Sequence, residues 1–287
     1  MTNLKFTFFG SSKFSVYCLE EMKSFGVIPI QIITTPDKPV GRGLKLEANP
    51  VKIWAEKNSI TCFTPETIKN TNFVSELSVI KTDLFLVASY GKIIPKDILH
   101  LSKFGTLNIH PSLLPKYRGS SPLQSQILNN ESNIGISIML LDELMDHGPI
   151  IAQENIIIPN WPVKFERLEE IMAQSGAKLF IKILPDWLTE KIIPKEQNHD
   201  DATFTKKVEK IDGLINIENC DQYKNYLKFL AYSTWPGTFF FIEKDNKKIR
   251  ILIKDAEFKD NSFLIKRVLP EGKKEMNYED FLRGLNG

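Results

Sequence analysis

A run of almost uninterrupted apolar residues at 83–89 (Asp-Leu-Phe-Leu-Val-Ala-Ser) most restricts how this chain can fold. A strand that is apolar on both faces must be covered on both, as in the middle of a parallel sheet between helices. Apolar runs at 4–9 and 28–34 enclose a segment, 14–24, whose apolar residues recur at helical spacing. The chain therefore opens β-α-β, and the pattern predicts an α/β fold with a doubly wound, mostly parallel sheet.

The same alternation continues along the chain. It predicts helices over 51–56, 66–77, 96–101, 120–128 and 166–184, and strands over 59–63, 104–108, 135–141 and 150–158. Pro185 is expected to end the last of these helices. Residues 35–50 interrupt the pattern with proline, glycine and basic side chains, which indicates a long exposed loop. This loop is either simply solvated or a contact for an anionic partner such as phosphate.

The periodicity changes in the last third of the chain. A polar, irregular stretch is followed by one helical segment at 221–231 and by short apolar runs at 238–242, 249–253 and 262–268. Short strands with turn signals are typical of a small β-barrel or an open sheet. We therefore expect an α/β domain over 1–195, a linker over 196–207 and a small β-rich domain over 208–287.

Composition excludes several classes of protein. The formal net charge of +2 is too small to indicate nucleic-acid binding by itself, so any basic surface must come from local clustering. Cys18, Cys62 and Cys220 are far apart, which indicates neither a disulfide framework nor a zinc site and fits a reducing cytoplasm. We expect no signal peptide, no membrane-spanning segment and no metal, and we expect a monomer.

One stretch, 108–119, has residues suited to chemistry. Asn108 and His110 are two apart, so on an extended backbone their side chains project to the same face. Pro111 disfavours a helical conformation at His110. The carboxyl end of a strand is where open α/β sheets bind ligands. Taken alone, His110 is better explained as a hydrogen-bonded histidine at a strand end, and it is the flanking residues that favour a functional role.

Asp146 lies in a glycine-bearing loop after another predicted strand, and a sheet could bring it beside His110. An aspartate paired with a histidine holds the imidazole in one orientation and favours its charged form. Asn108 would add an uncharged donor, and such donors stabilise an oxyanion forming at a carbonyl. No GxSxG nucleophile motif is present, so these residues suit direct attack on an acyl carbon by the substrate's own nucleophile.

Other charged residues near these motifs receive no role. We expect Asp142 and Glu143 to be solvated loop carboxylates. His100, His147 and His199 lack matching partners in the sequence pattern, so we assign them to no site.

These residues carry a family resemblance. Asn-x-His-x-Ser-Leu-Leu-Pro-x-x-Arg-Gly at 108–119, followed by Asp-x-x-x-Asp-x-Gly at 142–148, resembles the 10-formyltetrahydrofolate-dependent formyltransferases. Three further stretches resemble the branch of this family that acts on methionyl-tRNA. They are its basic loop, at 36–43, the start of its C-terminal domain, at 232–238, and its Gly-Lys-Lys-x-Met motif near the end of that domain, at 270–276. The resemblance covers nearly the whole chain.

The resemblance implies a fold, a reaction and a set of site residues. The fold would be a Rossmann-like, formyltransferase-type catalytic domain followed by an OB-like barrel that binds RNA. Asn108 and protonated His110 would polarise the formyl oxygen of 10-formyltetrahydrofolate, and Asp146 would orient His110 while the amine of methionyl-initiator tRNA attacks. The folate pocket would be lined by Ser89, Tyr90, Gly91, Ile93, Ser112, Leu113, Leu114 and Pro115, and tRNA would be contacted by Lys38, Arg42 and Lys45.

Two departures from the family pattern matter. Leu144 stands where the family has a glycine, so the bend before Asp146 must be made another way. The segment between Phe258 and Leu264 is short, which shortens the barrel by about a strand pair.

Three other functions remain open: formylation of an amino sugar or another small amine, hydrolysis of formyltetrahydrofolate, and an RNA-binding module with a relic site. The basic loop at 36–43 and the Gly-Lys-Lys-x-Met motif at 270–276 favour tRNA over a nucleotide sugar as the acceptor.

Overall fold

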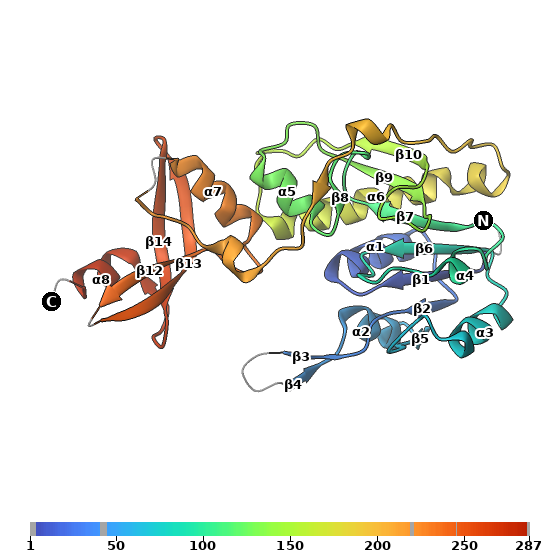
Figure 1. The fold of residues 1–287 in the computed structure, drawn as a ribbon, viewed down its shortest axis with the longest axis horizontal. Helices are drawn as coiled ribbons and strands as arrows, with labels where there is room; N and C mark the ends of the chain where they lie inside the picture. The colour runs from blue at the N-terminus through green and yellow to red at the C-terminus, as the bar shows by residue number, and fades with distance from the viewer. Residues whose placement is uncertain (1–3, 41–44, 219–220, 245, 286–287) are drawn as a thin grey trace. The chain divides into compact units, whose positions relative to one another are not determined.

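The computed structural model describes residues 4–40, 45–218, 221–244 and 246–285 (Figure 1). They form two compact units, each assembled from separate stretches of the chain. The first unit contains residues up to Ser120 together with 133–157 and 169–205, and the second contains 121–132, 158–168 and the residues from Lys206 onward.

The first unit is built on a seven-stranded sheet of order β10-β9-β7-β6-β1-β2-β5 (Figure 1). The strands are β1 (Phe6–Gly10), β2 (Gln31–Ile33), β5 (Thr61–Phe63), β6 (Leu84–Ala88), β7 (Thr106–His110), β9 (Gly135–Leu140) and β10 (Ile150–Asn155). All neighbours from β7 to β5 pair in parallel, and β9 is antiparallel to both β7 and β10. The predicted α/β fold with a mostly parallel central sheet is confirmed.

Helices cover both faces of this sheet. They are α1 (Lys13–Ser24), α2 (Pro50–Lys57), α3 (Thr71–Val79), α4 (Lys96–Leu99) and α6 (Phe165–Leu188). On one face, Phe9 of β1 and Phe85 of β6 pack with Ile98 of α4. On the other face, the ring of Phe6 lies 6.2 Å from the ring of Phe180 in α6. The central strands are therefore apolar on both sides, as their sequence indicates.

Helix α6 fixes which way the residues of β7 point. A Cβ added at Gly176 would collide with Ile109 and crowd Ile136, so only glycine allows this close approach of α6 to the sheet. Ile109 thus faces α6. Because side chains alternate along a strand, Asn108 and His110 face the opposite side.

Several element bounds differ from the sequence expectation. The segment 35–50 holds two short antiparallel strands, β3 (Lys38–Val40) and β4 (Lys45–Glu47), so the prediction of a loop was wrong there. Strand β7 continues past Asn108 to His110, because His110 pairs with Ser137 of β9.

Two helices, α3 and α6, differ most from the expected bounds. Helix α3 begins at Thr71 rather than at residue 66. The side chain of Asn70 caps this end of the helix by accepting the Asn72 N–H. Helix α6 runs through Pro185 to Leu188, and its last turn is held by the Trp187 indole, which donates to the Phe104 carbonyl at 3.1 Å. Such tertiary contacts are invisible in a local sequence pattern.

The second unit combines helices with a four-stranded antiparallel sheet of order β12-β13-β14-β15. Its elements are α5 (Pro122–Leu128), the 3-10 helix η2 (Lys210–Gly213), α7 (Gln222–Ala231), β12 (Phe239–Lys244), β13 (Lys247–Lys259), β14 (Ser262–Pro270), β15 (Met276–Asn277) and α8 (Tyr278–Arg283). Tyr226 of α7 packs on Phe258 of β13 and Phe263 of β14, with ring centroids 5.6 and 6.4 Å away.

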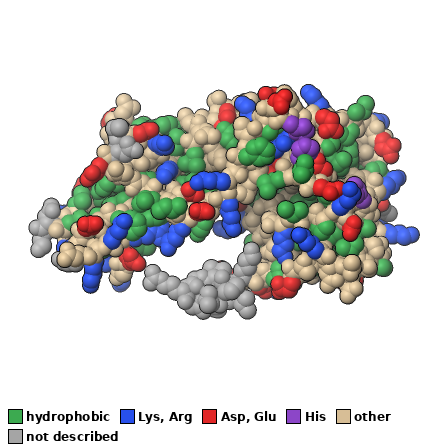
Figure 2. Space-filling view, viewed as in Figure 1, with side chains coloured by type: hydrophobic (Ala, Val, Ile, Leu, Met, Phe, Trp, Pro, Cys, Tyr) green, Lys and Arg blue, Asp and Glu red, His purple; other side chains and the backbone are tan. Residues whose placement is uncertain are grey.

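In the described residues this C-terminal sheet is open and antiparallel, so the shortened OB-like barrel implied by the resemblance is not seen there. Within the described residues, no pairing joins β12 to β15. Basic and acidic side chains are interspersed over the visible face of the protein (Figure 2), in keeping with a net charge of only +2. None of the described helices is long and apolar enough to cross a membrane.

Candidate active site

The candidate site lies at the carboxyl end of β7. Asn108 and His110 are almost buried, at 8% and 4% exposure. In the part of the chain that the structure describes, the Asn108 side chain has no hydrogen-bond partner. This amide is not among the fully buried polar atoms without a partner, so it reaches solvent and is accessible to a ligand.

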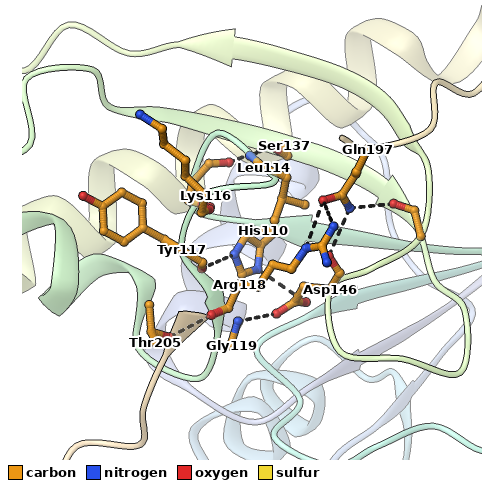
Figure 3. A network of polar contacts seen from close by, with 12 residues as sticks. His110, Leu114, Lys116, Tyr117, Arg118, Gly119, Ser137, Asp146, Gln197 and Thr205 are labelled. Carbon is orange, nitrogen blue, oxygen red and sulfur yellow. Dashed lines mark hydrogen bonds and ion pairs between the residues drawn. The ribbon is translucent and has the colours of Figure 1, made fainter. Parts of the chain in front are cut away.

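The imidazole of His110 lies between two oxygen atoms (Figure 3). Its Nε2 is 3.0 Å from the Tyr117 carbonyl oxygen, and its Nδ1 is 3.5 Å from Oδ1 of Asp146. A carbonyl oxygen only accepts hydrogen bonds, so Nε2 carries a proton and donates it to Tyr117, while Nδ1 faces the carboxylate of Asp146. The structure thus brings His110 and Asp146 together.

Asp146 makes the bend that a glycine would otherwise provide. Its φ is +48°, in the left-handed region that aspartate tolerates better than most residues. Its Oδ2 accepts the Gly119 N–H at 2.7 Å (Figure 3). The loop therefore turns at Asp146 itself, so it does not need a glycine at position 144.

A buried cation lies beside this pair. Arg118 is 3% exposed, and its Nε and Nη2 donate to Oε1 of Gln197 at 3.1 and 2.6 Å. Burial lowers the pKa of Arg118, while the nearby carboxylates of Asp146 and Asp142 act in the opposite direction. The same guanidinium donates to Nδ1 of His199 at 2.8 Å, so His199 acts there as an acceptor.

The expectation that His147 and His199 lack partners was wrong. The two rings stack with centroids 4.1 Å apart and planes 5° from parallel. Nδ1 of His147 is 2.6 Å from Oδ2 of Asp142, and Glu143 pairs with Lys96 at 2.5 Å, so neither carboxylate is merely solvated. The two histidines are far apart in sequence, which is why spacing alone did not relate them.

The residues expected to line a folate pocket fall into three groups. Tyr90, Ser112 and Leu114 are buried in the protein; the hydroxyl of Ser112, for example, donates to the Lys116 carbonyl at 2.6 Å. Ser89, Gly91 and Ile93 are exposed; they follow β6, which pairs with β7, and Ser89 and Gly91 have positive φ. Leu113 and Pro115 are half-buried.

The residues expected to contact tRNA are only partly described. Lys38 and Lys45 begin β3 and β4, and Arg42 lies outside the described residues. In the described part of the chain, no group of His, Cys, Asp and Glu is arranged to hold a metal ion.

Sequence reasoning missed several groups that shape the site. The Tyr117 carbonyl and the Gly119 N–H lie within the 108–119 motif, but a backbone role leaves no mark on residue type. Gln197 lies in the polar stretch predicted to be a linker, where no periodicity signals burial. Its burial, at 5% exposure, comes from contacts made across the fold.

Comparisons with known proteins agree on one family. A family model described as formyl transferase matches residues 4–184. The methionyl-tRNA formyltransferase of Rickettsia bellii is 32% identical over 302 residues, covering 98% of this chain and 97% of the relative. The corresponding protein of Dictyoglomus thermophilum is 34% identical over 306 residues, with 98% and 97% covered.

Solved structures share the fold. The methionyl-tRNA formyltransferase from Clostridium thermocellum has a TM-score of 0.61 at 18% identity, covering 93% of this chain and 98% of that one. A sugar N-formyltransferase from Shewanella sp. has a TM-score of 0.63 at 17% identity, covering 86% and 96%. At such identities the structures establish the fold without distinguishing the acceptor.

Proposed function

This chain belongs to the formyl transferase family, and on that premise we propose that it transfers the formyl group of 10-formyltetrahydrofolate to the amino group of methionyl-initiator tRNA. The product, N-formylmethionyl-tRNA, would serve translation initiation in the cytoplasm. The proposal is supported by relatives named methionyl-tRNA formyltransferase, which this chain matches over 97% of their length. An amino-sugar acceptor is the alternative that the structural neighbours leave open.

The arrangement of Asn108 and His110 carries the proposal. Both side chains project from the same face of β7, and the Asn108 amide has no partner in the described residues. The distance between Nδ1 of His110 and Asp146 is 3.5 Å, which exceeds an ordinary hydrogen bond. We infer that the Nδ1 proton and the Asn108 amide are donated to the formyl oxygen, where negative charge develops during attack.

The Tyr117 carbonyl and Asp146 would hold the imidazolium for this task. The bond of Nε2 to Tyr117 sets the plane of the ring, and the carboxylate stabilises its positive charge. The unprotonated amine of the methionyl group attacks the formyl carbon and forms a C–N bond. Asp146 accepts the proton that the new ammonium releases.

The tetrahedral intermediate then collapses. The bond between the formyl carbon and N10 of the folate breaks, and N10 leaves as tetrahydrofolate after receiving a proton from His110. The proton on Asp146 returns to His110, which restores both groups. No step requires a metal, and water has to be kept from the formyl carbon to avoid hydrolysis.

The test is formyl transfer from 10-formyltetrahydrofolate to four acceptors: charged initiator tRNA, charged elongator tRNA, free methionine and a nucleotide-linked amino sugar. We expect transfer to the initiator tRNA to exceed transfer to every other acceptor. Preference for the amino sugar would support the proposed formyl transfer but refute tRNA as the acceptor. Release of formate without transfer to any amine would refute the transferase proposal.

A further inference from the structure

One segment bonds to both of the loops that face the two nitrogens of the His110 ring. Residues 197–205, here named the strap, include the 3-10 helix η1 (His199–Asp201) and strand β11 (Phe204–Thr205). The strap follows the part of the chain that the family model matches, which ends at residue 184. All of it belongs to the first unit.

The end of the strap holds the loop that carries the Tyr117 carbonyl. Strand β11 pairs in parallel with β8 (Arg118–Gly119). The Tyr117 N–H donates to the hydroxyl of Thr203 at 2.8 Å, and the Arg118 N–H donates to the Thr203 carbonyl at 2.8 Å. The approach at Gly119 is so close that a Cβ there would lie 2.6 Å from the Thr205 carbonyl oxygen. The acceptor of His110 Nε2 is therefore held by the strap.

The start of the strap holds the loop that carries Asp146. Oε1 of Gln197 accepts two hydrogen bonds from Arg118, which leaves the amide nitrogen of Gln197 as the group that faces the loop (Figure 3). This Nε2 donates to the carbonyls of Asp146 at 3.0 Å and Gly148 at 2.7 Å. Arg118 thus fixes the orientation of the Gln197 amide, because the reverse orientation would set N–H against N–H.

We propose that the strap positions the catalytic imidazole from both sides, and that Gln197 is the residue that positions Asp146. Its two donated hydrogen bonds span the peptide units around His147 and hold Asp146 at its φ of +48°. In that conformation the carboxylate reaches both the Gly119 N–H and His110. This inference rests on the proposed function, because it assigns Gln197 a role in that reaction.

Two substitutions separate positioning from packing. Gln197→Glu keeps an acceptor for buried Arg118 and nearly the same volume, but it can no longer donate to the two carbonyls. Gln197→Met keeps the volume, adds no charge and removes both functions. Glu196→Ala is the control, since Glu196 directly precedes the strap and is exposed.

We expect Gln197→Glu and Gln197→Met to lower kcat for formyl transfer about 10- to 100-fold, as loss of a supporting hydrogen bond does in other sites. KM for 10-formyltetrahydrofolate and for the acceptor should change less than about threefold, because the Gln197 amide is buried and its bonds go to Arg118, Asp146 and Gly148. Glu196→Ala should match the wild type. Thermal unfolding of each variant shows whether the fold is retained.

A double-mutant cycle with Asp146→Asn supplies the decisive readout. If Gln197 acts through Asp146, Gln197→Glu should cost less than about twofold once the carboxylate is gone. Full kcat in Gln197→Glu, or an equal fold-loss in both backgrounds, overturns the inference while leaving the proposed function in place. A wild-type protein that formylates no acceptor refutes the proposed function and the inference with it.

Discussion

At the scale of single residues, the site consists of one titratable ring whose two nitrogens face different kinds of oxygen. Nε2 of His110 meets a backbone carbonyl, which side-chain substitution cannot remove, and Nδ1 meets a carboxylate. Asn108 adds a neutral donor on the same face of the strand. In the proposed mechanism, Nε2 therefore serves to orient the ring, while Nδ1 and the Asn108 amide stabilise the charge that develops on the formyl oxygen.

Replacing either donor should slow the chemical step. We expect Asn108→Ala and His110→Ala each to lose about 2–4 kcal/mol of transition-state stabilisation, which is roughly 30- to 1,000-fold in kcat. Folate affinity, measured by equilibrium binding of a non-reactive formyl-folate analogue, should change little. Near-full turnover in His110→Ala would contradict the mechanism.

Tyr90 supports a prediction about stability and pH. Its side chain is 2% exposed, its hydroxyl has no partner among the described residues, and burial raises its pKa from 10.0 to about 12. The unfolded chain therefore releases this proton at lower pH than the folded protein does. The stability linked to this group is fully present below pH 10 and is lost as the pH rises from about 10 to 12.

Tyr90→Phe should remove the part of the loss of stability above pH 10 that is linked to this hydroxyl. It should also stabilise the protein at pH 7 by about 1 kcal/mol, because an unpaired hydroxyl no longer has to be buried. Urea unfolding at pH 7 and at pH 11 measures both effects. A rise in the folate KM of this variant would instead show that the hydroxyl reaches the folate.

At the scale of elements, the positions of the regular strands and helices could be predicted wherever a local period decides them. Continuous apolar runs predict the strands β1 and β6, and apolar residues at helical spacing predict the helix α1. The continuation of α6 through Pro185 and the stacking of His147 on His199 depend on residues distant in sequence. For the same reason, the sequence predicts the pairing of His110 with Asp146 but not the role of Gln197.

The packing of α6 on β7 gives an element-scale prediction. Gly176→Ala adds a Cβ that would collide with Ile109, so the helix and the strand must move apart. We expect a loss of about 1–3 kcal/mol in the free energy of unfolding, together with a fall in kcat because Asn108 and His110 are carried on the same strand. Lys178→Ala, an exposed change two residues further along α6, serves as the control in the same urea titration and should cost less than about 0.5 kcal/mol.

At the scale of the whole molecule, recognition of an RNA cannot rest on net charge, since 37 basic residues are nearly balanced by 35 acidic ones. A local basic cluster has to supply the attraction, and the stretch from Lys38 to Lys45 is the one we propose. This chain and its relatives named methionyl-tRNA formyltransferase match each other over almost their full lengths. The relatives therefore have a sequence counterpart of both units of this chain.

Replacing Lys38, Arg42 and Lys45 together by alanine should weaken tRNA binding and make it less dependent on salt. The slope of log K against log salt should become shallower by about 0.7 to 0.9 for each phosphate that a basic side chain no longer neutralises. Folate KM should stay unchanged, and Lys191→Ala, at an exposed residue after α6, should leave the slope as it is. An equal loss of folate affinity would count against assigning this stretch to RNA.

The strap also determines where this protein can be joined to another. A chimaera that exchanges C-terminal regions between formyltransferases at residue 184, where the family match ends, would bring in a foreign Gln197 and Thr203 against a native Arg118 and Tyr117. A junction placed after Thr205 keeps each catalytic loop with the segment that supports it. If the strap positions His110 as proposed, the catalytic unit of this chain extends about twenty residues beyond the stretch that the family model matches. Recombination within those residues would separate the catalytic loops from the segment that supports them.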